Sequence, residues 1–228
     1  MWVLCADDGR VLQFRMDTGP VERQNNHPDL ETTGNIVIHF MDRLAGCGHK
    51  LYIDNWYHSA SLAVHLKRKG IGVIGTVRED RLKGCKVLSS DNDLKKRANQ
   101  DGRGIMELAI AKEKDIEIRV VKWFDNRSVR VLTNMASVNP IGTVQRWDKK
   151  QKKYIEVPIP DMITQYNQHM EGVNLLDKLI ALYRIHLRSR KWYHRILFNF
   201  LDLALVNDFK AIGGGQGSKN DVWLFFKF

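Results

Sequence analysis

The chain has 228 residues, 43% hydrophobic and 27% charged, which suits a globular domain with a core of its own. Its formal net charge of +10 favours a polyanionic partner, because each cation set against a phosphate releases a counterion. Cys5, Cys47 and Cys85 are far apart and form no CxxC pair, which argues against a disulfide framework or a zinc module and favours a reducing compartment. No apolar run is long enough to span a bilayer, so no membrane partner is expected.

The first predicted elements are a hairpin and a polar loop. Residues 2–6 are an apolar run of strand formers, Asp7-Asp8-Gly9 is a turn signal, and residues 11–14 have the pattern of a second strand. Residues 17–34 are polar and contain glycine and proline, which predicts a loop. Because a fold rarely opens on the first residue of a core strand, we expect further sequence upstream of Met1.

Helical and strand patterns then alternate along the chain. Apolar residues from Ile36 to Leu44 recur at helical spacing, and residues 51–53 form a short apolar strand. Residues 59–68 have a helical pattern with Ser59 as its N-cap, and residues 73–77 are typical of a buried strand. This order predicts a mixed α/β layer fold.

The middle of the chain is predicted to consist mostly of β-strands. Residues 78–104 are charged and mobile in character, and with them we end the first part of the core at residue 104. Strand-like alternation follows, which predicts a β-rich insertion over residues 105–157. The strands expected in this insertion cover residues 105–110, 116–123, 128–134 and 154–157.

The last part of the chain is predicted to be helical. Asp161 is suited to cap a helix whose apolar stripe runs from Ile163 to Ile180, and a further helix follows residue 195. We assign residues 158–210 to the helical part of the core. Residues 211–228, which include several glycines, are predicted to be a flexible tail.

Acidic residues follow two of the predicted strands. Asp54 comes directly after residues 51–53, at the strand end where α/β folds bind ligands, although capping of the next turn would also explain it. Asp7 and Asp8 follow the first strand, in a turn where Asp-Gly is common in any case. Two such carboxylates and one from a helix could hold a pair of Mg²⁺ ions.

The helical candidates are Asn174 and Asp177, which lie three residues apart and share a helix face. A solvated face with a surface ion pair is the alternative explanation for them. The stretch 184–195 is the candidate for contact with a DNA backbone, with Trp192 stacking on a base or, alternatively, anchoring the core with Tyr193. The candidate DNA-binding residues are Arg184, Arg188, Arg190, Lys191, Trp192, His194 and Arg195.

Three segments of the chain resemble piggyBac-type transposases. The run from Tyr52 to Ser59, followed by Gly70 to Val77, resembles the segment around the family's second catalytic Asp. The run from Gly172 to Asp177, followed by Tyr183-Arg184 and Arg190 to Arg195, resembles the segment around the third. Asp7-Asp8-Gly9 and the strand before it resemble the region of the first. The matches occur in the family's order and extend over nearly the whole chain.

The resemblance implies an RNase H-like mixed sheet flanked by helices, with a β-rich insertion. It also implies cutting and joining of DNA at TTAA sites by two Mg²⁺ ions held by three Asp residues, and a nuclear location. It places the first acid at Asp7, with Asp8 as the alternative, and the second at Asp54. The third position holds Asn174, and Asp177 follows it one turn later. The expected metal ligands are therefore Asp7, Asp54 and Asp177.

Asn174 separates two functional hypotheses, because a neutral amide replaces a charged metal ligand. The first is a transposable element-derived protein that binds DNA but is impaired in cleavage and strand transfer. The second is an active, Mg²⁺-dependent transposase of which this chain is a part. A protein-binding scaffold is a third alternative. DNA is the expected partner, a homodimer is left open, and no small-molecule substrate is expected.

Overall fold

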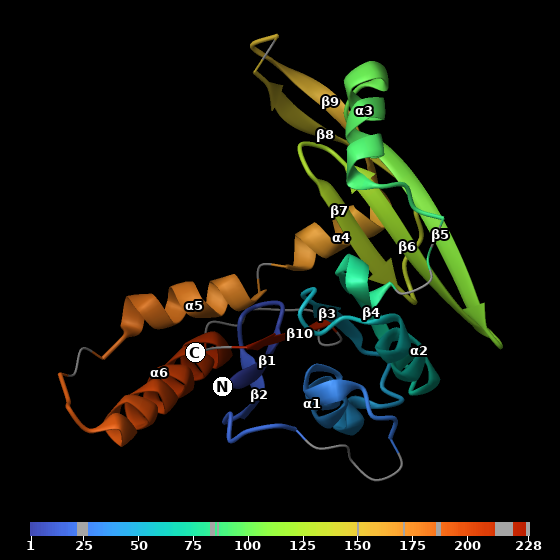
Figure 1. Cartoon of the computed structure of the whole chain (residues 1–228). Coiled ribbons are helices and arrows are strands. Elements are labelled where there is room, and N and C mark those ends of the chain that lie inside the picture. Colours follow the sequence, from blue (N-terminus) through green and yellow to red (C-terminus); the bar gives the residue numbers. More distant parts are fainter. Residues whose placement is uncertain are drawn as a thin grey trace. The chain divides into compact units, whose positions relative to one another are not determined.

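The structure, a computed structural model, describes residues 1–21, 27–82, 85, 87–149, 151–170, 172–185, 188–212 and 221–226. They fall into two units, one of Met1–Pro20 with His169–Phe228 and the other of Val21–Gln168. Figure 1 labels the elements of both. Strands and helices occur in each unit, as the predicted α/β pattern requires.

The strands of the first unit form an antiparallel sheet in the order β2-β1-β10. β1 (Trp2–Ala6) is buried along its whole length. It pairs with β2 (Val11–Arg15) on one side and with β10 (Asp221–Phe226) on the other. The predicted N-terminal hairpin is therefore confirmed. Because β1 has a partner strand on each edge, its backbone hydrogen-bonding groups are satisfied in the interior.

β10 corrects the prediction of a flexible tail over residues 211–228. Residues 211 and 212 end a helix, residues 213–220 lie outside the described part of the chain, and residues 221–226 form a strand. Apolar and aromatic residues of the kind found here favour strands. Their pairing with β1 also closes a strand edge that would otherwise be open.

Two helices complete the first unit, α5 (Gly172–Tyr183) and α6 (Trp192–Ile212), and they contact each other. Asn207 of α6 ties this helix to β2 through two hydrogen bonds. Its Nδ2 donates to the carbonyl oxygen of Val11 over 3.0 Å, and its Oδ1 accepts from the Val11 amide over 2.8 Å. The apolar stripe predicted as one helix from Ile163 to Ile180 is divided between two, and a glycine, a poor helix former, begins the second.

The second unit contains a mixed sheet in the order β3-β4-β7-β6-β5. β3 (Lys50–Ile53) and β4 (Gly72–Thr76) are parallel and are connected by α2 (Ala60–Arg68). β7 (Ser128–Thr133), β6 (Ile116–Phe124) and β5 (Ile105–Glu113) continue the sheet in antiparallel pairs. Because Ile53 is paired with Gly75, β3 and β4 end side by side.

The remaining elements of this unit are mostly helical. They are α1 (Glu31–Met41), the 3-10 turns η1 (Asp42–Leu44) and η2 (Glu79–Arg81), α3 (Asp91–Asp101) and α4 (Asp161–His169). β8 (Ile141–Asp148) and β9 (Lys153–Pro160) form a separate hairpin. The strands predicted between residues 105 and 157 are present. The cap predicted for α2 is confirmed, because Ser59 Oγ accepts a hydrogen bond from the Leu62 amide over 3.2 Å.

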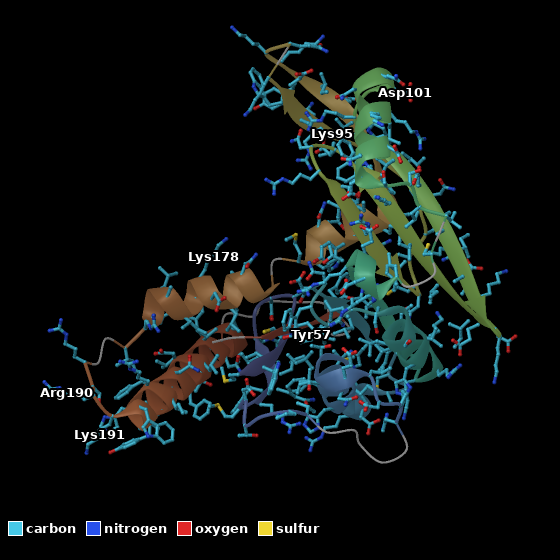
Figure 2. The ribbon with its side chains drawn as sticks, in the orientation of Figure 1. Tyr57, Lys95, Asp101, Lys178, Arg190 and Lys191 are labelled. Atoms are coloured by element: carbon cyan, nitrogen blue, oxygen red, sulfur yellow. The ribbon has the colours of Figure 1, made fainter. Side chains whose placement is uncertain are left out.

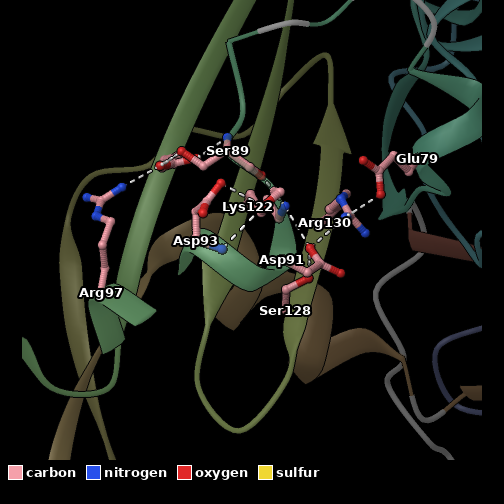
Figure 3. A network of polar contacts seen from close by, with 10 residues as sticks. Glu79, Ser89, Asp91, Asp93, Arg97, Lys122, Ser128 and Arg130 are labelled. Atoms are coloured by element: carbon pink, nitrogen blue, oxygen red, sulfur yellow. Dashed lines mark hydrogen bonds and ion pairs between the residues drawn. The ribbon is translucent and has the colours of Figure 1, made fainter. Parts of the chain in front are cut away.

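α3 corrects the prediction that residues 78–104 are mobile throughout. The helix lies against β5 and β6, as Figure 1 shows, and its N-terminus is held by the polar network of Figure 3. At the centre of this network is Lys122 of β6, whose side chain is 1% exposed and whose Nζ lies 2.7 Å from an Asp91 oxygen. Arg130 of β7 pairs with the same carboxylate at 2.7 Å. Charge pairing across the sheet therefore orders a segment that has little apolar surface of its own.

Candidate functional site

Asp54 lies directly after β3, and its carboxylate is exposed. Its Oδ1 accepts a hydrogen bond from the Asn55 amide over 2.6 Å and another from Thr76 Oγ1 over 3.1 Å. Thr76 is the last residue of β4, the parallel neighbour of β3. Both bonds fall on one oxygen, so within the described residues Oδ2 receives none. The carboxylate is thus held in place with one oxygen available to a ligand.

Two buried tyrosines lie in the electrostatic field of Asp54. Burial raises the pKa of the Tyr57 phenol, and the negative charge of Asp54 raises it further. Burial also raises the pKa of Tyr166, which hydrogen-bonds Thr76 and experiences the same charge. Both phenols therefore stay neutral. Tyr166, Thr76 and Asp54 form a hydrogen-bonded series that links α4 to the end of β3.

An aromatic residue and a cation accompany Asp54 on the surface. Trp56 is half exposed, and the Arg78 guanidinium lies 4.8 Å from the centre of its ring. Arg78 Nε also donates to Asn55 Oδ1 over 3.4 Å. This arrangement suits a phosphate or a base beside the carboxylate. Arg78 was not among the site residues predicted from the sequence. Its position two residues after the end of β4 could have indicated it, because ligands bind at this end of the strands.

His58 has a structural role in this segment. It is completely buried, and its Nδ1 lies 3.1 Å from the carbonyl oxygen of Gly75. Burial lowers the pKa of His58 to about 4, against the opposing effect of its hydrogen bonds to the backbone. The ring is neutral at physiological pH, and its contact with Gly75 links the turn after Asp54 to β4.

In the other unit, the turn after β1 holds Asp7 and Asp8. The Asp8 carboxylate is engaged with Arg10, accepting hydrogen bonds from its backbone amide over 3.0 Å and from its Nε over 2.7 Å. Asp7 Oδ1 is buried. Asp8 is thus paired with a cation, whereas Asp7 has a buried carboxylate oxygen.

The same turn packs against the beginning of α5. A Cβ atom added to Gly9 would lie 3.3 Å from the Leu176 amide nitrogen and 3.5 Å from the Gly172 carbonyl oxygen. Gly9 also has a φ of +84°, a conformation that favours glycine. The structure therefore brings the first-acid turn next to the helix that carries Asn174, which is exposed, and Asp177, which is partly exposed. Asp54 belongs to the other unit.

The expected metal ligands are divided between the two units, with Asp7 and Asp177 in one and Asp54 in the other. Among the described residues, no group of three or more His, Cys, Asp or Glu side chains is placed to hold a metal ion. A pair of dications needs the charge of several carboxylates. Asn174 has no charge, and Asp8 is neutralised by Arg10.

The basic stretch 184–195 is only partly a loop, because α6 already begins at Trp192. Three of its predicted DNA-binding residues, Arg184, His194 and Arg195, line one cavity of about 380 Å³. Ser189 also lines it, with Oγ 2.8 Å from His194 Nδ1.

The remaining predicted DNA-binding residues lie on the open surface. Figure 2 shows Arg190 and Lys191 extending from the turn between α5 and α6, and Arg188 is exposed as well. Trp192 is 72% exposed, so it does not act as a core anchor. Its ring is accessible to a stacking partner instead.

Comparison with known proteins identifies the family. Residues 1–209 match the sequence model of the family described as Transposase IS4. The human piggyBac transposable element-derived protein 2 is 28% identical over 210 residues, which are 91% of this chain and 34% of that protein. This chain belongs to the piggyBac-type transposase family. The human piggyBac transposable element-derived protein 3 is 33% identical over 184 residues, 79% of this chain and 30% of that protein.

A solved structure confirms the fold expected of a piggyBac-type protein. A piggyBac transposase synaptic complex with hairpin DNA resembles this chain with a TM-score of 0.61 at 17% identity. The similarity extends over 89% of this chain and 38% of that one. The α/β, RNase H-like fold class is therefore confirmed. The chain spans about a third of the length of these relatives. In the present chain, none of the described helices is long and apolar enough to cross a membrane.

Proposed function

We propose that the protein is a transposable element-derived DNA-binding protein of piggyBac type, impaired in cutting and joining DNA. The observation that carries DNA binding is the cavity shared by Arg184, His194 and Arg195. Guanidinium groups bind phosphate oxygens through several donors at once, and the cavity collects two of them with a serine and an asparagine. Its one carboxylate, Asp202, is buried and accepts a hydrogen bond from the Ile185 amide over 3.2 Å, so the cations of the lining outnumber it. With DNA as the proposed partner, we expect the protein to be located in the nucleus.

The exposed residues next to this cavity extend the proposed surface. Arg188, Arg190 and Lys191 would bind phosphates, and Trp192 offers a ring on which an unpaired base could stack. Each phosphate contact releases a counterion, so the affinity must fall as salt rises. A protein-binding scaffold has no such requirement.

The proposed impairment rests on Asn174. By resemblance, this position supplies a charged ligand to two Mg²⁺ ions, which would activate water on one side of the phosphate and stabilise the leaving oxygen on the other. An amide supplies no charge, and Asp177 lies one helical turn further on. We expect weak metal binding and slow cleavage.

A second candidate function is an active, Mg²⁺-dependent transposase that acts at TTAA sites, with this chain as one part of it. The observation that favours it is the fixed position of the Asp54 carboxylate. Thr76 and the Asn55 amide donate hydrogen bonds to this carboxylate, which would orient it as a metal ligand. A homodimer is compatible with either proposal.

The DNA-binding test is a salt titration monitored by fluorescence anisotropy of a labelled duplex. We expect the double change Arg184→Gln and Arg195→Gln to weaken binding and to reduce the slope of log K against log salt by about 2. Lys95→Gln, which removes an exposed charge on α3, is the control and should reduce it far less. A slope equal to that of wild type in the double variant would contradict the proposed surface.

The cleavage test compares wild type with Asn174→Asp on a transposon-end hairpin in Mg²⁺ or Mn²⁺. Restoring the carboxylate is expected to raise the rate by at least about 100-fold and to tighten Mn²⁺ binding measured by calorimetry. Asp54→Ala should abolish cleavage in both backgrounds. Equal rates for wild type and Asn174→Asp would favour the active transposase instead.

A further inference from the structure

A second cavity of about 320 Å³ lies within the unit of Val21–Gln168. Residues from the end of β6, the β6–β7 turn, the start of β7, β8 and α4 line it, and Val129 is the β7 residue. It is separate from the basic cavity beside α6, which belongs to the other unit. None of the residues predicted from the sequence to bind DNA contributes to it.

One part of this cavity is apolar and firmly held. Trp123 is buried, and its indole nitrogen donates to the Pro158 carbonyl oxygen over 2.8 Å, which joins β6 to β9. Ile163 of α4 is also buried. A wall of this kind suits a flat, apolar face, because neither side chain has to change position to receive it.

The rim of the cavity is cationic. Asp125 is paired with two arginines, Arg103 and Arg146, and the Arg146 Nε lies 3.0 Å from its Oδ2. One carboxylate between two guanidinium groups leaves a net positive charge. Arg127 adds a further cation, since it is exposed and forms no ion pair within the described residues. This charge favours an anionic group at the mouth of the cavity.

Two amides complete the lining, Asn126 in the β6–β7 turn and Asn167 on α4, and both are exposed. An amide side chain offers a donor and an acceptor together, which matches the edges of nucleobases. An apolar wall, two amides and a cationic rim correspond to the base, the base edge and the phosphate of one nucleotide.

The cavity is linked to Asp54 through two side chains. Tyr166 lines the cavity and hydrogen-bonds Thr76, which in turn donates to Asp54 Oδ1 over 3.1 Å. A nucleotide in the cavity would therefore have its neighbours along the strand close to Asp54.

We infer that this cavity binds one unstacked nucleotide of a DNA strand that passes Asp54, with Arg127 and Arg146 on its phosphate. The inference rests on the proposed DNA binding and goes beyond it, because it names an unpaired nucleotide as a feature that the protein recognises. Extrusion of a base costs free energy, and this cost is lowest where the base is already unpaired.

The test uses two labelled duplexes of equal length, one fully paired and one with a single unpaired nucleotide. Wild-type protein should bind the second about tenfold more tightly in an anisotropy titration. Arg127→Ala, which removes the unpaired cation, and Val129→Phe, which fills the cavity, should each abolish this preference. Both variants should change the affinity for the paired duplex by less than about threefold.

Lys95→Ala is the matched control, since it removes an exposed positive charge of the same unit from a residue that does not line the cavity, and it should keep the preference. 2-Aminopurine at the unpaired position gives a direct readout, because its fluorescence changes on transfer into the cavity. Arg127 is exposed, so its variant remains informative if Val129→Phe fails to fold. Equal binding of both duplexes by wild type, or a preference that survives Arg127→Ala, would overturn the inference while proposed DNA binding stands. Failure to bind either duplex would overturn both.

Discussion

The hydroxyl of Thr76 donates a hydrogen bond of 3.1 Å to the Oδ1 of Asp54, although the two residues are 22 positions apart. The contact exists because β3 and β4 are parallel and end at the same edge, with Ile53 opposite Gly75. Parallel strands joined by a helix bring their carboxyl ends together, and α/β folds bind ligands there. Substitution of Thr76 therefore tests the geometry of the candidate site around Asp54.

Replacement of Thr76 by valine removes this hydrogen bond and the one between Thr76 and Tyr166, and it keeps the β-branched shape. We expect the free energy of unfolding to fall by about 2 kcal/mol in urea titrations, at a typical value of about 1 kcal/mol for each hydrogen bond. Thr76→Ser retains the hydroxyl and should differ from wild type by less than about half of that. An equal loss in both variants would show that packing, and not the hydrogen bond, is responsible.

Gly75 should not tolerate a side chain. A Cβ atom there would lie 2.1 Å from the Ile53 carbonyl oxygen and 3.0 Å from His58 Nδ1, so β3 and β4 would have to separate. We expect Gly75→Ala to lower the free energy of unfolding by about 3 kcal/mol or to prevent folding. Gly142→Ala is the control, because its nearest neighbour would be at an ordinary 3.7 Å. Similar unfolding midpoints for the two variants would contradict the close approach.

His58 should make the stability depend on pH. Burial lowers the pKa of His58 from its usual value to about 4 in the folded protein, so between these values the unfolded chain binds the proton more readily. The contribution of neutral His58 is complete above about pH 6.5 and is lost as the pH falls towards about 4. We expect His58→Gln to flatten the profile of unfolding free energy against pH in this window. A profile as steep in His58→Gln as in wild type would contradict this role of His58.

Lys122 should support α3 through charge. We expect Lys122→Met to lower the free energy of unfolding by about 2 kcal/mol, because a buried cation that donates to Asp91 and to the Ser89 carbonyl is lost. Hydrogen exchange should rise in the amides of α3 before it rises in β6. Lys95→Met, on the exposed face of α3, should change stability by less than about 0.5 kcal/mol. Unchanged exchange in α3 would show that the helix is held by other contacts.

Asp91 should make the stability of the same network fall at acidic pH. Burial acts to raise the pKa of Asp91, but hydrogen bonds from Lys122 and Ser128 and the charges of Arg130 and Lys122 outweigh it and hold the pKa below its usual value. A lowered carboxyl pKa contributes stability above the ordinary value near pH 4, and that contribution is lost as the pH falls further. Asp91→Asn should reduce the loss of stability in acid, measured by thermal unfolding at several pH values. If Asp91→Asn lost as much thermal stability at acidic pH as wild type does, this role of Asp91 would be contradicted.

Local signals determined much of this protein from the sequence alone. The N-cap Ser59, the apolar run of β1 and the end of β3 before Asp54 depend on neighbouring residues, and the structure has them where they were predicted. The family was recognisable for the same reason, since its motifs are short runs of consecutive residues. Asn174 was visible as a departure from one of them.

Contacts between distant residues decided the rest. β10 becomes a strand because β1, more than 200 residues earlier, offers it an edge, and α3 is ordered because Lys122 and Arg130 lie on strands that follow it in the chain. The nucleotide-sized cavity is formed by residues of β6, β7, β8 and α4 together with the β6–β7 turn, which are distant in the sequence. Side chains become partners through the path of the backbone, and strand propensity or helical periodicity contains no information about that path.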